Sequence, residues 1–167
     1  MRQALIFLLL LQPSPVRAQS RGDFVGTILA AHNSARARHG AAPLAWSDAL
    51  AASALAYAGV LARTNSFQHD PTPGRRRREG ENLWMGARGV YAYPVMIAGF
   101  LHEERAFRPG LFPMVSATGN WSDVAHFTQM IWPTTTVIGC GLASNAWSDF
   151  LVCRYAPPGN KDGTAIR

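Results

Sequence analysis

The two cysteines of the chain constrain its fold more than any other feature. Cys140 lies in "TVIGCGLAS" and Cys153 in "DFLVCRYAP", two β-prone runs separated by the turn-like "NAWS". If the hairpin turns about Ala146 and Trp147, the two cysteines lie equally far from the turn and face each other. Directly opposed residues at a non-hydrogen-bonded position have Cα atoms about 4.5 Å apart, which suits a disulfide. The spacing therefore predicts a hairpin closed by a Cys140–Cys153 disulfide.

The first residues predict export. "MRQ" carries one positive charge, "ALIFLLLL" is an unbroken apolar run, and "VRA" before Gln19 offers small residues for cleavage. The run is well short of the roughly 18 residues of a membrane-spanning helix, and no other stretch is long and apolar enough. We interpret residues 1–18 as a signal peptide and residues 19–167 as one secreted domain, extracellular or periplasmic. An oxidising compartment favours the disulfide over two reduced cysteines or a cysteine metal site.

Composition agrees with one globular domain and localises the charge. The chain has 167 residues and 48% hydrophobic content, enough for one sizeable core. Its formal charge of +6 becomes +4 without Arg2 and Arg17, and Arg75–Arg78 form a run of four positive charges. This run has two interpretations, a solvated loop after Pro73 or a patch for an anionic surface such as phospholipid headgroups. No aromatic residues interleave with it, so we expect no nucleic-acid partner.

Three longer segments predict helices. Residues 23–40 and 46–62 carry apolar residues at helical spacing, with Gly40 after the first and Ser47 as N-cap of the second. A third helix is expected from Pro94 to about residue 107. The predicted buried stripes are Phe24, Ile28 and Ala31; Leu50, Ala54, Tyr57 and Leu61; and Met96, Phe100, Glu103 and Phe107.

The glutamate in the third stripe requires an explanation. A buried ionised carboxylate is normally protonated, paired or bound to a metal. Periodicity leaves open two alternatives: Glu104 faces inward instead of Glu103, or both lie at a solvent-exposed helix end.

The segment "VAHFTQMIW", residues 124–132, combines polar and core-like residues. Ser122 or Asp123 can cap a short helix here, and Pro133 ends it. His126 and Gln129 then share one face, as expected for a helix that lines a cleft with its back on the core. A hydrogen-bonded structural histidine is the other interpretation.

Five motifs occur in order along the chain: "LAAHNSARARHGAAPLAWSDALAASALAYA", "FQHD", "GENLW", "HFTQMIW" and "VCRYAPPGN". Together they resemble the CAP superfamily of cysteine-rich secretory proteins, insect antigen 5 and plant pathogenesis-related 1 proteins. The resemblance implies an α+β fold, a three-layer α-β-α sandwich with a central, mainly antiparallel sheet. It also implies a cleft lined by His69, Glu81, Glu103 and His126, and it favours Glu103 over Glu104.

The chain departs from the family pattern at several positions. Asp70 replaces a serine after the first histidine, Arg154 replaces the asparagine of a "CNY" motif, and Phe100 replaces a tryptophan. An added carboxylate at Asp70 is expected either to raise metal affinity or to cap the loop before Pro71. Most disulfides of eukaryotic members are absent.

These residues predict a site for a divalent metal or a small ligand. Two neutral imidazoles, His69 and His126, can begin a Zn²⁺ site that water or a carboxylate completes. Such a site permits a zinc-dependent hydrolase with a glutamate as general base, but "HExxH" and "GxSxG" are absent, so we favour binding without catalysis. A closed hydrogen-bonded network of the four residues is the alternative. Gln129, Asn82 and Asp70 are expected to support the site, and Gln129 to orient His126 or a bound water.

Two further functions are compatible with the sequence. Some family members bind sterols, and here Leu83, Trp84, Met85, Tyr91 and Tyr93 are expected either to line a lipid or sterol groove or to pack in the core. Some plant members are thought to release a C-terminal peptide, for which residues 157–167 are the counterpart; an ordered terminus is the simpler expectation.

Overall fold

A four-stranded sheet forms the centre of the molecule. The computed structural model describes residues 21–167, so the predicted signal peptide lies outside the described residues. The strand order is β1-β4-β5-β2, with only the β1–β4 pair parallel. The predicted mainly antiparallel sheet is therefore confirmed. Its strands are β1 (Ala45–Trp46), β2 (Gly80–Ala87), β4 (Val137–Ser144) and β5 (Ser148–Ala156).

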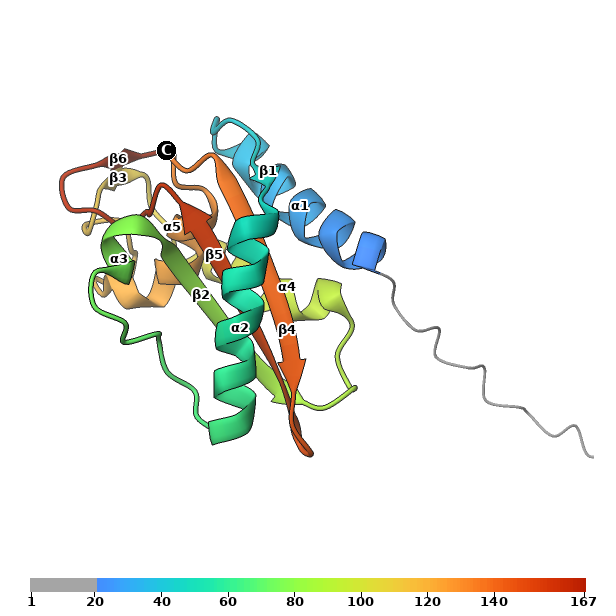
Figure 1. The fold of residues 1–167 in the computed structure, drawn as a ribbon. Coiled ribbons are helices and arrows are strands. Elements are labelled where there is room, and N and C mark those ends of the chain that lie inside the picture. Colours follow the sequence, from blue (N-terminus) through green and yellow to red (C-terminus); the bar gives the residue numbers. More distant parts are fainter. Residues whose placement is uncertain (1–20) are drawn as a thin grey trace, which may run out of the picture.

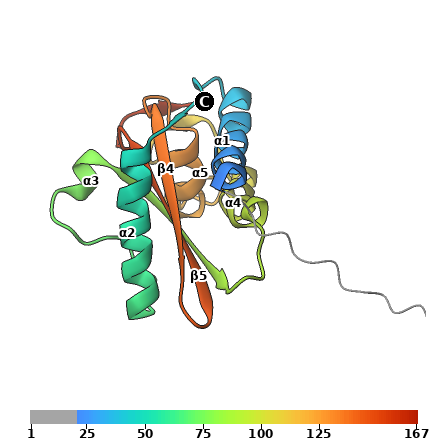
Figure 2. The same ribbon diagram turned by 45° about the vertical axis from the view of Figure 1, so that its right-hand side comes forward.

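Helices cover both faces of the sheet, which gives the three predicted layers (Figures 1 and 2). Helix α2 (Asp48–Thr64) packs on β4 and β5, and the one-turn helix α3 (Arg75–Arg78) lies on the same side. The opposite layer contains α1 (Arg21–Arg38), α4 (Tyr93–Leu101) and α5 (Ala125–Met130), which contact one another. The α-β-α sandwich is thus the observed architecture.

The β4–β5 hairpin has the predicted register and disulfide. Cys140 lies directly opposite Cys153, and a disulfide joins them with their Cα atoms 4.1 Å apart. Asn145 accepts hydrogen bonds from the amides of Trp147 and Ser148 and so closes the turn. The turn is therefore centred where the sequence predicted it.

Close contact with the sheet holds α2 in place. Ser47 caps the helix by accepting a hydrogen bond from the Leu50 amide, and the predicted stripe is buried. A Cβ added to Gly141 of β4 would lie only 2.3 Å from the backbone of Leu55, so the helix packs directly on glycine. Leu83, Phe150 and Val152 of the sheet complete this apolar layer.

The helices beside the cleft differ from the prediction at their ends. Helix α4 ends at Leu101 and continues as a 3-10 turn, η1 (His102–Arg105), so Glu103 lies just beyond the α-helix. A second 3-10 turn, η2 (Trp121–Val124), precedes α5. The predicted caps Ser122 and Asp123 were therefore wrong, because Asn120 accepts the hydrogen bond from the Ser122 amide at the start of this extra turn.

Arg36 connects α1 to the irregular segment between α5 and β4. Its side chain is fully buried, and burial lowers the pKa of the guanidinium to about 10. It donates hydrogen bonds to the carbonyl oxygens of Ala42, Met130, Trp132 and Thr135. The sequence patterns did not predict a buried arginine in this helix.

The C-terminal residues are packed against the domain. Strand β6 (Ala165–Ile166) pairs with β3 (Gly110–Leu111), and Ile166 is buried. The Gly159 amide donates to Gln129, and Asn160 bonds to Thr128. Across residues 21–167, no helix combines the length and hydropathy needed to cross a bilayer.

Candidate functional site

A cleft of about 310 Å³ opens beside the start of β2. His69 comes from the loop before α3, Glu81 and Asn82 from β2, and His126 from α5, and all four line the cleft. Glu103 does not line it and lies behind His126, to which it is bonded. Three of the four residues that the resemblance placed in the lining therefore line the cleft, and Glu103 reaches it only through His126.

His69 is anchored by Glu81. The His69 Nδ1 donates to Glu81 Oε1 at 2.6 Å, so Nε2 is the ring nitrogen that takes no part in this bond. The side chain of Glu81 is 1% exposed whereas that of His69 is 46% exposed. The carboxylate is therefore part of the interior, and the imidazole faces the cleft.

Buried arginines surround Glu81. Arg154 lies directly opposite it across the β2–β5 pair, with Nη1 3.2 Å from Glu81 Oε2, and Arg75 Nη2 lies 3.4 Å from Glu81 Oε1. Arg154 also pairs with Asp70 at 2.7 Å and lies over the ring of Tyr57 on α2. We call Asp70, Arg75, Glu81 and Arg154 the charged network. It lies on the sheet face that α2 covers.

The charged network is balanced in charge but not fully hydrogen-bonded. Two guanidiniums face two carboxylates, yet Glu81 Oε2 and Arg154 Nε and Nη1 have no hydrogen-bond partner among residues 21–167. Glu81 Oε2 and Arg154 Nη1 are held as an ion pair only. Burial alone would raise the pKa of Asp70, but hydrogen bonds from Thr72 and Arg154 outweigh it and lower that pKa to about 2. Hydrogen bonds to the carboxylate therefore keep Asp70 ionised.

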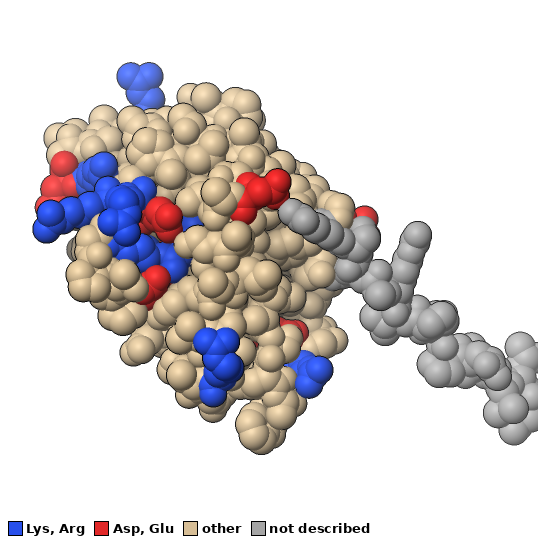
Figure 3. All heavy atoms as spheres, in the orientation of Figure 1, with Lys and Arg blue, Asp and Glu red and all other residues tan. Residues whose placement is uncertain are grey.

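The arginine run divides between the interior and the surface. It forms helix α3 rather than the expected loop, and Arg75 is buried while Arg76, Arg77 and Arg78 are exposed. Basic side chains gather over the same region of the surface (Figure 3). The prediction of a solvated loop is therefore wrong for Arg75. Its guanidinium donates to the backbone carbonyls of Asp70 and Glu79 and to the Glu81 carboxylate.

His126 is anchored by Glu103. Its Nδ1 donates to Glu103 Oε1 at 2.5 Å, while Glu103 Oε2 accepts hydrogen bonds from the backbone amides of His126 and Phe127. Phe100 stacks on the imidazole with ring centroids 5.0 Å apart. Glu104 instead pairs with Arg38 on the surface at 2.7 Å. Of the two glutamates, Glu103 is the one that points inward.

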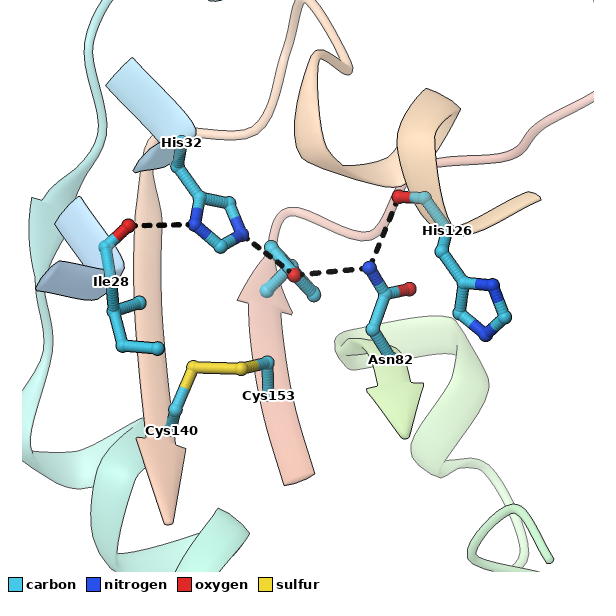
Figure 4. Close-up of a disulfide and its surroundings, with 7 residues drawn as sticks. Ile28, His32, Asn82, His126, Cys140 and Cys153 are labelled. Carbon is cyan, nitrogen blue, oxygen red and sulfur yellow. Dashed lines mark hydrogen bonds between the residues drawn. A yellow bond between two sulfur atoms is a disulfide. The ribbon is translucent and has the colours of Figure 1, made fainter. Parts of the chain in front are cut away.

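A second, uncharged network holds the backbone of α5 (Figure 4). Asn82 donates to the His126 carbonyl at 3.0 Å and to the Tyr155 hydroxyl at 3.1 Å, and that hydroxyl lies 2.9 Å from His32 Nε2. His32 Nδ1 must carry its proton, because its partner is the Ile28 carbonyl at 2.8 Å. The Tyr155 hydroxyl therefore donates to Nε2.

Protonation is fixed in this neutral network, which we define as His32, Asn82 and Tyr155. Burial is the largest effect on His32 and lowers its pKa to about 4, so the ring is neutral near pH 7. Burial also raises the pKa of Tyr155. The sequence analysis missed both residues; the available signal was His32 four positions after Ile28, on the predicted stripe of α1.

The three supporting residues have different roles from one another. Asn82 holds α5 as described. Asp70 caps the loop by accepting a hydrogen bond from the Thr72 amide, and it also pairs with Arg154. The expectation that Gln129 orients His126 was wrong: its amide contacts Gly159 and Thr135. Gly80 and Gly159 leave the space that this amide fills, so it points toward the C-terminal segment.

The predicted aromatic set does not line one groove. Leu83 and Trp84 are consecutive in β2 and therefore face opposite sides of the sheet. Leu83 packs under α2, Trp84 contacts the ring of Tyr91, and Tyr93 contacts Phe24. Core packing therefore explains Leu83, Trp84 and Tyr93, whereas Met85 and Tyr91 are exposed.

The geometry suits a metal site with few protein ligands. Both imidazoles use Nδ1 to bind a carboxylate, an arrangement that orients many metal-binding histidines through the other nitrogen. Within residues 21–167, no three or more side chains among His, Cys, Asp and Glu converge as a ready-made metal site. Any ion here would therefore take its remaining ligands from water or from a bound molecule.

Comparisons with known proteins agree with the fold and motifs. The family model described as "Cysteine-rich secretory protein family", CAP, matches residues 29–155. "Secreted protein RBT4" of Candida albicans is 34% identical over 145 residues, covering 85% of this chain and 37% of that protein. "Pathogenesis-related protein 1C" of Nicotiana tabacum is 28% identical over 160 residues, covering 95% and 88%. The chain spans only about two fifths to one half of the fungal relatives it matches.

Solved structures share the architecture. NaASP2, whose crystal structure was determined with Zn²⁺, superposes with a TM-score of 0.68 at 22% identity, covering 92% of this chain and 88% of that one. Venom allergen-like protein 4 of Schistosoma mansoni gives a TM-score of 0.62 at 20% identity, covering 84% and 93%. At these identities the likeness concerns the fold.

Proposed function

Since this chain belongs to the cysteine-rich secretory protein family and is secreted, we propose that its cleft binds a divalent metal ion, with Zn²⁺ the best candidate, through His69 and His126. The observation that carries the proposal is that each imidazole has its Nδ1 fixed by a carboxylate, so that Nε2 can bind an ion. The zinc-containing structure of NaASP2 adds support by similarity of fold.

The surroundings favour binding over hydrolysis. A bound Zn²⁺ would supply Lewis acidity and open coordination positions. A hydrolase also needs a base that can accept a proton from water. Glu81 Oε1 already accepts from His69, Asp70 and Arg75, and Glu103 accepts from one side chain and two backbone amides. Both carboxylates therefore serve to orient the histidines.

Calorimetric titration of Zn²⁺ into the mature protein tests the proposal. We expect binding that weakens at least about tenfold in the His69→Ala/His126→Ala variant, comparable to the loss that follows removal of a residue orienting a metal ligand. His102→Ala is the matched control, because His102 is exposed on η1 and does not line the cleft. Equal zinc affinity in the double variant and the wild type would contradict the proposal. A large loss of metal-free stability in the double variant would instead favour the closed network.

A second candidate, binding of an apolar ligand such as a lipid acyl chain or sterol, is favoured by another groove. This groove of about 480 Å³ lies between α1, α2 and β4, and Phe24, Trp46, Leu55 and Tyr93 contribute to its walls. Concave apolar surfaces of this size suit small hydrophobic ligands. Binding can be measured as the displacement of a bound fluorescent fatty acid by an unlabelled one. Leu55→Lys should abolish this binding, whereas Val95→Lys, which alters an exposed residue outside the groove, should keep it. Equal displacement in both variants would exclude this site.

A further inference from the structure

One arginine of the cleft wall has no internal partner. Arg76 lines the cleft and is exposed, and within residues 21–167 its side chain forms no hydrogen bond or ion pair. Its neighbour Arg75 differs, since the Arg75 guanidinium donates to Asp70, Glu79 and Glu81. The Arg78 side chain is also exposed and has no partner in the described part of the chain, but it does not line the cleft. Arg76 is therefore a cation available to a molecule in the cleft.

Within residues 21–167, the nearby acidic groups contact other arginines or His126, and none contacts the Arg76 side chain. Glu81 and Asp70 are balanced by Arg75 and Arg154 within the charged network. Glu103 is occupied by His126 and two backbone amides. Glu79, the remaining carboxylate at the cleft, lies 3.7 Å from Arg154. Counted once each, Arg75, Arg76 and Arg154 balance Asp70, Glu79 and Glu81 in formal charge, and Arg76 is the arginine of this group that no carboxylate contacts within residues 21–167.

A metal ion at the two histidines would give this part of the cleft an excess of positive charge. Neutral imidazoles contribute no negative charge, and an ion held by two of them retains open coordination positions. An oxyanion bound to the ion can also accept charge-assisted hydrogen bonds from a guanidinium, whose planar fork matches carboxylate, sulfate and phosphate groups. Such a group would offset the positive charge of both the metal ion and Arg76.

We propose that the cleft binds its metal ion together with an acidic ligand group, a carboxylate, sulfate or phosphate ester, and that Arg76 is the residue that selects for this group. The inference rests on the proposed metal site and adds the class of ligand. Anion and metal then bind cooperatively, and each raises the affinity of the other by the same factor.

The experiment is a zinc titration with and without sulfate at one ionic strength, set with a weakly coordinating salt. Sulfate should tighten zinc binding by about fivefold or more, the lower end of common coupling between sites. Arg76→Gln should reduce the gain to less than about twofold, while Arg78→Gln should keep it. The two variants remove the same charge from the same helix, so general electrostatics affects them alike. Acetate and methyl phosphate in place of sulfate distinguish the three acidic groups.

Each result has one meaning. Zinc binding that no anion strengthens, or an equal response of Arg76→Gln and Arg78→Gln, overturns the inference and leaves the metal site standing. Absence of zinc binding overturns the proposed function and the inference with it. Titration of zinc into sulfate without protein corrects for their association in solution, and thermal unfolding confirms that both variants are folded.

Discussion

The charged and neutral networks lie on opposite faces of the same end of the sheet. Glu81 and Arg154 are opposed across β2 and β5, and the next residues along, Asn82 and Tyr155, point to the other face. Glu81 holds the side chain of His69, whereas Asn82 holds the backbone of His126. One wall of the cleft therefore depends on balanced charge, and the other on the direction of a few hydrogen bonds. The two networks should fail under different conditions.

Removal of a carboxylate from the charged network should give the largest effect. Glu81→Ala removes one of the two carboxylates that Arg75 and Arg154 share, and leaves the two buried guanidiniums with Asp70 as their common partner. We expect the free energy of unfolding to fall by about 3–5 kcal/mol, as when one member of a buried ion pair is lost. Chemical denaturation measures this. Glu104→Ala, which removes a surface pair with Arg38, should cost less than about 1 kcal/mol. Similar losses from both would show that burial of the charges is unimportant.

Acid should weaken the neutral network in a separate pH range. The pKa of His32 is about 4 in the folded protein and near 6.5 when unfolded, so between these values the unfolded chain binds more protons. Stability is then highest above pH 6.5 and declines as the pH falls toward 4, by about 3 kcal/mol from this residue.

Denaturation of wild type and His32→Gln at pH 7 and pH 4.5 isolates this contribution, because the other titrating groups are common to both proteins. The variant should be the less stable at pH 7 and should lose less stability on acidification. An unchanged pH dependence would contradict the assignment of a neutral buried imidazole. Asp70 behaves differently, since its depressed pKa makes its contribution full above its unfolded value, near pH 4, and lost toward pH 2.

The smallest expected effect is the coupling between the two residues that depart from the family pattern. Asp70 and Arg154 form a 2.7 Å ion pair, where the resemblance leads to serine and asparagine. In a double-mutant cycle of Asp70→Ser and Arg154→Asn, the double variant should be more stable than the sum of single losses implies, by about 1–3 kcal/mol. Zinc affinity measured on the same four proteins shows whether the pair also positions His69. Additive stability changes would mean that the two departures are independent.

Local patterns predicted the elements and failed for contacts between distant segments. The hairpin and disulfide followed from alternation about a turn, and the α2 cap and stripe followed from helical spacing. The Asp70–Arg154 pair joins residues 84 positions apart, which no local period reveals. Gln129 was assigned to the wrong partner for the same reason, because Gly159 approaches it only in the folded chain. His32 followed the apolar stripe, but its hydroxyl partner lies on a different strand.

The single side chain of Arg36 has a consequence for how this fold tolerates change. Between α5 and β4 the backbone is irregular, and two of its carbonyl groups converge on that guanidinium, together with one from the last residue of α5 and one from the loop after α1. A lysine would keep the positive charge but offers donors from one nitrogen only. At this position the constraint is the shape of the cation. Its planar guanidinium donates the hydrogen bonds that a neighbouring strand would otherwise supply to these carbonyl groups, so the backbone next to α5 is satisfied without further secondary structure.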